Sequence, residues 1–245
     1  MAQIKKNGLV VGKMGDVVYQ VCNGKQILKE NNRDVKLTAE SKQCSTEFSA
    51  ANNASANLRN GLQLYVSGMA DTAMHGRFTG AIFHAIRNSH QTGEGRERVG
   101  QRTFEDANLS LLEGFEFNKN TPFSEYCTVD HELNFTDGIV RIAVNGFSKS
   151  KHLKRIPNTQ GEVLLYGVAA FNPKSQGLIG SVQEFRVRGN YPDTLLEWQS
   201  EPIPQGKVVL VFAAVIYYGM PTLEGKKVLT NRQLHPCKIV AAFTS

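Results

Sequence analysis

The sequence has few of the features that identify common classes of protein. Its 245 residues include only four cysteines, at positions 22, 44, 127 and 237, and no two of them have the Cys-x-x-Cys spacing of zinc or redox sites. Four cysteines in a chain of this length do not make a disulfide framework, and each lies in an apolar pattern. We therefore predict four small buried side chains and no cofactor.

Long apolar runs are also missing. The best candidate for a membrane span, residues 208–218, is shorter than the roughly 18–20 residues that a spanning helix needs, and predicts a buried strand. The opening MAQIKKNGLVVGKMG has only a three-residue apolar run before Gly12, unlike a secretory signal. We expect a soluble protein made in the cytoplasm without an integral membrane segment, and release or export by another route stays open.

No recognised catalytic motif occurs. The run from Gly8 to Met14 resembles a phosphate-binding loop, but it has one residue too few between its glycines and a methionine where magnesium needs Ser or Thr. The six histidines form neither HxH nor HExxH, and GxSxG is absent. His235 and Cys237 could share a strand face as base and nucleophile, but a turn histidine beside a buried cysteine explains them more simply. We expect no enzymatic activity, and the sequence identifies no small-molecule substrate.

The charge balance is moderately basic, with 28 Lys and Arg against 22 Asp and Glu, a net charge of +6 and a pI near 9.1. Such a balance allows weak attraction to nucleic acid or another polyanion. The densest basic runs lie in loop-like sequence, where charges commonly just meet water. They comprise Arg96, Arg98 and Arg102, and Lys149, Lys151, Lys154 and Arg155.

The N-terminal region has the pattern of a β-hairpin. Residues 16–22 and 25–29 read as strands, and Asn23-Gly24 between them suits the positive φ angles of a type I′ turn. A mostly apolar hairpin near a chain end is suited to adding to the open sheet edge of a neighbouring molecule. The residues that we expect to mediate self-association are Val17, Val18, Tyr19, Val21, Asn23, Gly24, Ile27 and Leu28.

The middle of the chain predicts two helices. Apolar residues recur every three or four positions over 38–67, with Thr38 as the N-cap, and a second helix is expected over 72–88. Gly76 and Gly80 weaken this second helix by roughly 1 kcal/mol each relative to Ala, unless they allow close packing against a neighbour. The Gly-rich, charged stretch 91–103 predicts a linker.

From residue 104 the period changes to two, which indicates strands. The expected strands are 127–135, 139–145, 162–171, 181–188, 194–198, 207–218, 226–229 and 237–243. We predict an α+β fold with an N-terminal β-hairpin and helical pair (1–92) and a C-terminal antiparallel β-sandwich (104–245). Residues 109–117 would tie the two regions together by burying Phe115 and Phe117, so the regions could form one cooperative unit.

Two motifs carry a resemblance. Gly12-Lys-Met-Gly-Asp-Val-Val-Tyr19, followed by Asn23-Gly24-Lys25, and the central Leu-Leu-Glu-Gly-Phe-Glu-Phe-Asn at 111–118 are similar to segments of an uncharacterised bacterial protein family. The order of segments matches over nearly the whole chain. Lys29-Glu-Asn-Asn32 departs from the pattern and leaves the end of the hairpin open. The resemblance implies architecture and no particular activity.

These observations favour a structural function. We expect a non-enzymatic protein that assembles with itself, through β-strand addition, into a homo-oligomer or filament. The alternative is a basic binding module for nucleic acid or another polyanion, which would use the two basic runs.

Overall fold

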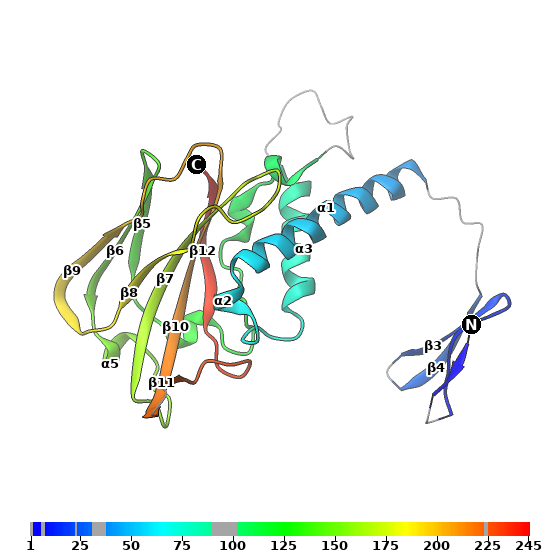
Figure 1. Cartoon of the computed structure of the whole chain (residues 1–245), viewed down its shortest axis with the longest axis horizontal. Coiled ribbons are helices and arrows are strands. Elements are labelled where there is room, and N and C mark those ends of the chain that lie inside the picture. Colours follow the sequence, from blue (N-terminus) through cyan, green and yellow to red (C-terminus); the bar gives the residue numbers. More distant parts are fainter. Residues whose placement is uncertain (1, 6–7, 23, 31–37, 90–101, 223–224) are drawn as a thin grey trace. The chain divides into compact units, whose positions relative to one another are not determined.

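The chain folds into an α+β protein with helices and antiparallel strands in three sheets (Figure 1). The computed structural model describes residues 2–5, 8–22, 24–30, 38–89, 102–222 and 225–245. Contacts between residues divide the chain into two units, 1–42 and 43–245. The boundary that we expected between 92 and 104 therefore lies inside the second unit, and the helices belong with the C-terminal strands.

The first unit is a four-stranded sheet, hereafter the N-terminal sheet. Its strands run in the order β1 (Gln3–Ile4), β2 (Val10–Met14), β3 (Val17–Cys22) and β4 (Lys25–Glu30), each antiparallel to the next. Gly15 and Gly24 stand at φ +63° and +76° in the turns that flank β3, a conformation that glycine adopts without steric cost. Residue 23 lies outside the described residues.

The second unit contains the helices. They are α1 (Ala39–Gly61), whose first residues belong to the first unit, α2 (Gln63–Val66), α3 (Met74–Arg87), α4 (Phe123–Tyr126) and α5 (Lys149–His152), with two 3₁₀ turns at Phe104–Asp106 and Leu109–Leu112. The Ser41 amide donates a hydrogen bond to the Thr38 hydroxyl oxygen over 3.1 Å, so Thr38 caps the start of α1. Ala51, Ala54 and Leu58 form the buried stripe of α1, as their spacing predicts.

Two sheets complete this unit. A five-stranded sheet is built on β7 (Gly161–Phe171), β8 (Gln183–Val187), β10 (Val208–Thr222), β11 (Gly225–Val228) and β12 (Cys237–Thr244). β10 pairs with β7 along one side, and with β12 and then β11 along the other. A three-stranded sheet has the order β5 (His131–Thr136), β6 (Ile139–Phe147), β9 (Tyr191–Gln199).

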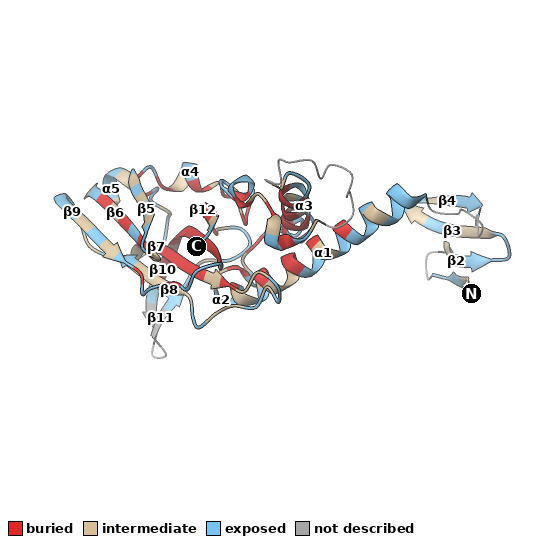
Figure 2. Ribbon diagram, turned by 90° about the horizontal axis from the view of Figure 1, so that it is seen from above, coloured by how far each residue is buried: buried red, intermediate tan, exposed pale blue. Residues whose placement is uncertain are grey.

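The alternation of side chains along β10 explains how these layers stack. Leu210, Phe212 and Ala214 belong to a core cluster shared with α1 and α3, whereas Val209, Val211 and their alternate neighbours belong to a second cluster shared with β6. The five-stranded sheet is therefore covered by helices on one face and by the three-stranded sheet on the other (Figure 2). Because both faces of the sheet are covered, β10 carries apolar side chains on both of its faces.

The segment 114–117 runs beside β12. The amides of Gly114 and Phe117 donate to the carbonyl oxygens of Ile239 and Cys237, both at 2.9 Å, and the Ile239 amide donates to the Phe115 carbonyl. This segment therefore supplies hydrogen-bond partners to the outer edge of β12. The sequence analysis had expected residues 109–117 to link two regions of the chain. Phe117 is fully buried and Phe115 packs against the same core.

Two local predictions were wrong, and one of two alternatives for the glycines of α3 is excluded. Cys22 and Cys44 are exposed, and only Cys127 and Cys237 are buried. A Cβ added at Gly76 or Gly80 would meet nothing within 4 Å, so these glycines do not serve close packing of α3. Residues 149–152 form the short helix α5 where loop was expected. The sequence pattern around each of these residues does not show which side of the segment a neighbouring element covers.

Candidate functional site

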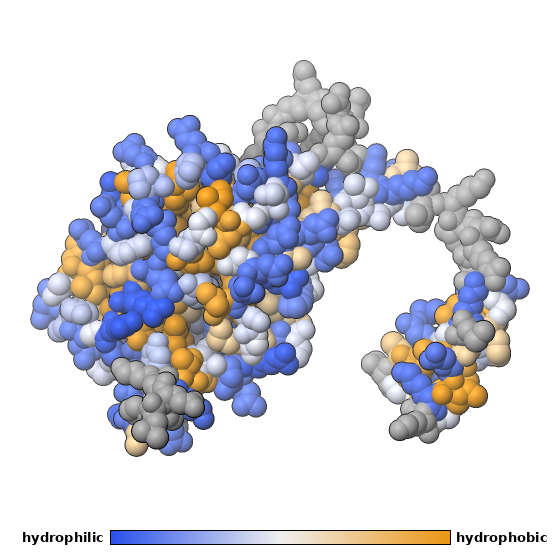
Figure 3. All heavy atoms as spheres, viewed as in Figure 1, coloured by the Kyte–Doolittle hydropathy of each residue, from blue (hydrophilic) through white to orange (hydrophobic). Residues whose placement is uncertain are grey.

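The N-terminal sheet carries an apolar face. Residues paired directly across antiparallel strands point to the same face, and Tyr19 pairs with Leu28 while Val17 pairs with Met14. Val21 follows Tyr19 at the same period. Leu28 and Met14 are each 59% exposed, and no described residue of residues 1–42 is buried. Figure 3 shows apolar residues on the visible surface of these strands.

The predicted self-association residues are divided between the two faces. Val17, Tyr19, Val21 and Leu28 lie on the apolar face, whereas Val18 and Ile27 point to the opposite face. Gly24 lies in the turn, and Asn23 lies outside the described residues. The predicted set is therefore not a single surface, because the side chains of a strand alternate between its two sides.

Strand β4 forms an open edge of this sheet. Among the described residues it pairs only with β3, so one side of its backbone is unpaired. Lys25, Ile27 and Lys29 occupy alternate positions and share one face of β4, and all three are exposed. An open edge with this pattern combines free backbone groups with two positive charges around an apolar centre.

Strand β9 forms a second open edge, in the other unit. In the part of the chain that the structure describes, it pairs only with β6. Its inner side chains, Leu196 and Trp198, pack on the core between the sheets. Asp193, Leu195 and Glu197 alternate with them and are exposed, Leu195 by 53%. This edge presents two negative charges around an apolar centre, and the sequence analysis did not identify it.

The basic residues of the alternative site are dispersed or already engaged. Arg96 and Arg98 lie outside the described residues. The Arg102 guanidinium donates a hydrogen bond to the Arg87 carbonyl oxygen. The Lys154 ammonium lies 4.5 Å from the centre of the Tyr126 ring, a cation–π contact.

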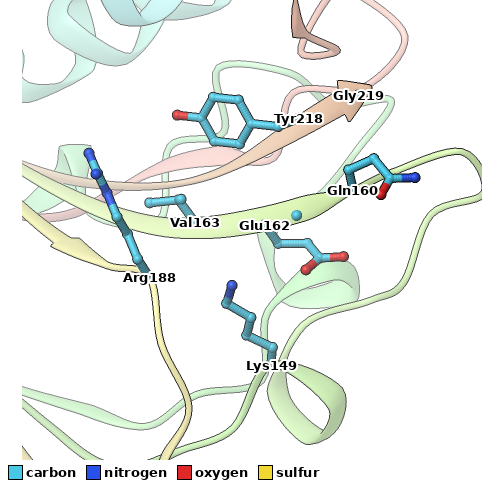
Figure 4. Close-up of a pocket in the computed structure, with 8 residues that line it drawn as sticks. Lys149, Gln160, Glu162, Val163, Arg188, Tyr218 and Gly219 are labelled. Atoms are coloured by element: carbon cyan, nitrogen blue, oxygen red, sulfur yellow. The ribbon is translucent and has the colours of Figure 1, made fainter. Parts of the chain in front are cut away.

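Three basic residues remain near α5. Lys149 and Lys151 belong to this helix, and Arg155 follows it. Lys149 lines a cavity of about 450 Å³ together with Arg188, Glu162 and Tyr218 (Figure 4). Arg188 was not among the predicted residues, because its approach to Lys149 depends on how β8 pairs with β7.

His235 and Cys237 do not form the arrangement of a base and a nucleophile. Both are buried, and no hydrogen bond joins their side chains. Burial lowers the pKa of His235 to about 4 and raises the pKa of the Cys237 thiol. Burial likewise raises the pKa of Cys127 to about 11. Both thiols are therefore protonated at neutral pH, which works against thiolate chemistry.

The described ranges contain no group of three or more His, Cys, Asp or Glu side chains that could hold a metal ion. Among the helices of those same ranges, none has the length and apolar character needed to cross a membrane.

In comparisons with known proteins, no protein-family model, no curated protein and no solved structure matches the chain. The resemblance to the uncharacterised bacterial family therefore stays a prediction. The class that the fold defines is an α+β protein, and its function has to be argued from its surfaces.

Proposed function

We propose that this is a structural, self-assembling protein whose copies join by β-strand addition, with β4 of one copy pairing with β9 of a second copy. One observation carries the proposal. One exposed face of β4 reads Lys-Ile-Lys at alternate positions, and the exposed face of β9 reads Asp-Leu-Glu. Both strands have a free edge in the described structure, so neither would have to break an existing pair.

The two patterns are in register. A parallel pair would set Lys25 beside Asp193, Ile27 beside Leu195, and Lys29 beside Glu197. Each opposite-charge pair across two strands stabilises by roughly 0.2–1 kcal/mol.

The backbone directions require a parallel pair. Lys25 pairs with Cys22, so the backbone groups of Lys25 and its alternate neighbours point to β3. The Ser200 amide donates to the Val140 carbonyl oxygen, so Ser200 and its alternate neighbours point to β6, and Leu195 and Glu197 direct their backbone groups to the free edge. Residues directly opposite in an antiparallel pair must both face the partner strand or both face away from it, so only a parallel pair brings the two patterns side by side.

The geometry of such a contact leads to an extended assembly. Each copy would offer one donor edge and one acceptor edge, so the contact is head-to-tail, which produces rings or open filaments. A single pair formed by the six residues of β4 is weak, because association costs at least about 4 kcal/mol of lost translational and rotational freedom. The apolar face of the N-terminal sheet adds to it, since burying Leu28 and Met14 would contribute roughly 1.5–3 kcal/mol for each side chain.

Charge reversal tests the proposal. A variant with Lys25→Glu and Lys29→Glu changes two attractive pairs into two repulsive ones, which should weaken association by about 2 kcal/mol, or about 30-fold. A second variant, with Asp193→Lys and Glu197→Lys, should fail to assemble for the same reason. A mixture of the two variants should assemble again, because each β4 then meets a β9 of opposite charge. Light scattering with size-exclusion chromatography and negative-stain microscopy measures all three samples.

A matched control separates specific pairing from net charge. Lys119→Glu with Lys174→Glu makes the same change in net charge at two exposed sites of the second unit and should leave assembly unchanged. A wild-type protein that stays monomeric at all concentrations would rule the proposal out, as would a mixture that fails to recover. In a Cys22→Ser, Cys44→Ser background, Lys25→Cys and Asp193→Cys should form a disulfide between copies if the strands are parallel.

We infer a second candidate function, polyanion binding, from Lys149 and Arg188. These two cations face one cavity, and neither forms an ion pair with a described carboxylate. Retardation of DNA or RNA at low salt that disappears in a Lys149→Gln, Arg188→Gln variant would favour it, and no retardation at low salt would exclude it.

A further inference from the structure

A second cavity lies on the helix-facing side of the five-stranded sheet, next to α2. Its volume is about 340 Å³, within the range of small-molecule sites. The floor is apolar and consists of Leu165 on β7 and Ala214 and Ile216 on β10. Leu165 and Ala214 are directly paired and at most 2% exposed, so the floor is a continuous part of the core surface.

One end of this cavity is charged. The Tyr65 hydroxyl donates to Glu184 Oε1 at 2.6 Å, and the same carboxylate forms an ion pair with Arg186. Arg186 pairs with Leu165 across the neighbouring strands, and therefore stands beside the floor. Its side chain is 38% exposed and places a fixed guanidinium at the mouth, with donors beyond those that face Glu184.

The opposite end holds polar atoms without partners. His235 is 2% exposed, and neither of its ring nitrogens makes a hydrogen bond within the described structure. The backbone of Tyr65 partly offsets the lowering of the His235 pKa. It does not reach hydrogen-bond geometry with either ring nitrogen of His235. The Thr230 hydroxyl is buried beside the same cavity and is also unpartnered.

Buried polar groups without partners are costly, and proteins rarely retain them unless a ligand or water completes them. A neutral imidazole carries one donor and one acceptor nitrogen, and a threonine hydroxyl can do either. This end of the cavity therefore suits an uncharged group that both donates and accepts hydrogen bonds, such as a hydroxyl. Arg186 at the other end suits a carboxylate.

We propose that this cavity binds a small aromatic acid with a hydroxyl group at the end opposite its carboxylate. The carboxylate pairs with Arg186, the ring lies on Leu165, Ala214 and Ile216, and the hydroxyl meets His235 and Thr230. The strand that carries Arg186 and the chain that carries His235 flank β7 and β10, so three strand spacings, about 14 Å, separate their backbones. The space left between the two side chains suits one ring with a short acid side chain. The site does not depend on self-assembly, since every residue in it belongs to residues 43–245.

Three related compounds test the assignment on the full chain. The probe is 3-(4-hydroxyphenyl)propanoate, with 3-phenylpropanoate lacking the hydroxyl and 3-(4-hydroxyphenyl)propanamide lacking the charge. Titration calorimetry and ligand-observed NMR should give the tightest binding for the probe, and each comparison compound should bind about tenfold more weakly. Equal binding of all three compounds, or no binding of any at millimolar concentration, would overturn the proposal.

Variants locate the binding. Glu184→Gln with Arg186→Gln removes the charge at the mouth without stranding a carboxylate, and should abolish the preference for the acid over the amide. Arg141→Gln, at an exposed position on β6, is the matched control and should leave binding unchanged. Ala214→Leu fills the floor and should prevent binding. If that variant does not fold, magnetisation transfer from the probe's ring protons to the Ile216 methyl groups of the wild type decides the location, and its absence would refute the site.

Discussion

His235 makes the stability of the second unit depend on pH in a way that can be separated from other groups. The ring is 2% exposed, and burial lowers its pKa from 6.5 to about 4. A base with a lowered pKa stabilises the fold fully above the pKa of the unfolded chain, and this contribution is lost as pH falls toward the folded pKa. The loss should therefore develop between pH 6.5 and pH 4.

The magnitude follows from the two pKa values. Linkage gives a loss of about 2 kcal/mol in the free energy of unfolding between pH 7.5 and pH 5. Glu116 acts in the opposite direction, because burial raises its pKa to about 6, so its protonation stabilises the fold as pH falls. Asp71 and Glu184 act in the same direction as His235, because their pKa values are lowered in the fold. The pH dependence of the wild type therefore combines several groups, and a variant is needed to isolate the contribution of His235.

The assay compares wild type with His235→Gln, which removes the titrating ring and keeps a polar side chain. Urea unfolding at several pH values can be followed by the fluorescence of Trp198, the single tryptophan, which stacks on Phe185 with ring centres 6.1 Å apart. The wild type should lose about 2 kcal/mol relative to the variant between pH 7.5 and pH 5.

His75→Gln, at an exposed position of α3, is the control and should follow the wild-type profile. A wild-type minus His235→Gln difference that stays constant with pH would refute the reasoning, since it would mean that the imidazole titrates alike in the folded and unfolded chains.

Two further predictions concern packing and access. Gly167→Ala places a Cβ 2.2 Å from the Phe212 ring in the middle of β7 and should lower the free energy of unfolding by about 2–3 kcal/mol, whereas Gly80→Ala meets open space on α3 and should raise it by up to about 1 kcal/mol, both measured by urea unfolding. Iodoacetamide should alkylate Cys22 and Cys44 in the native protein and the two buried cysteines only after unfolding, as peptide mass mapping can show. Equal labelling of all four thiols in native buffer would contradict the described burial.

The secondary structure was largely accessible from the sequence because its signals are local. The helix expected over 72–88 is found at Met74–Arg87, since Phe78, Ile82 and Ile86 follow the helical period. The two-sided apolar pattern of 207–218 predicted a central strand, and β10 is flanked on both edges and covered on both faces. The general class, α+β, was confirmed.

The candidate sites were less accessible. The predicted hairpin residues include both faces of the N-terminal sheet, and the acidic pattern on β9 was overlooked because an exposed alternating strand looks the same at an edge and within a sheet. Arg188 joins Lys149 only through the pairing of β8 with β7. His235 and Thr230 lack partners only because of what surrounds them, and no sequence pattern records that.

The sequence alone therefore determined the class of fold, most elements and the apolar stripes that build the core, because periodicity and turn chemistry act over a few residues. The tertiary structure alone decided which strand edges stay open, which cysteines are exposed, and where a cavity forms between Arg186 and His235. Those properties depend on segments far apart in the chain, whose pairing is set by the burial of the whole core and not by any local signal.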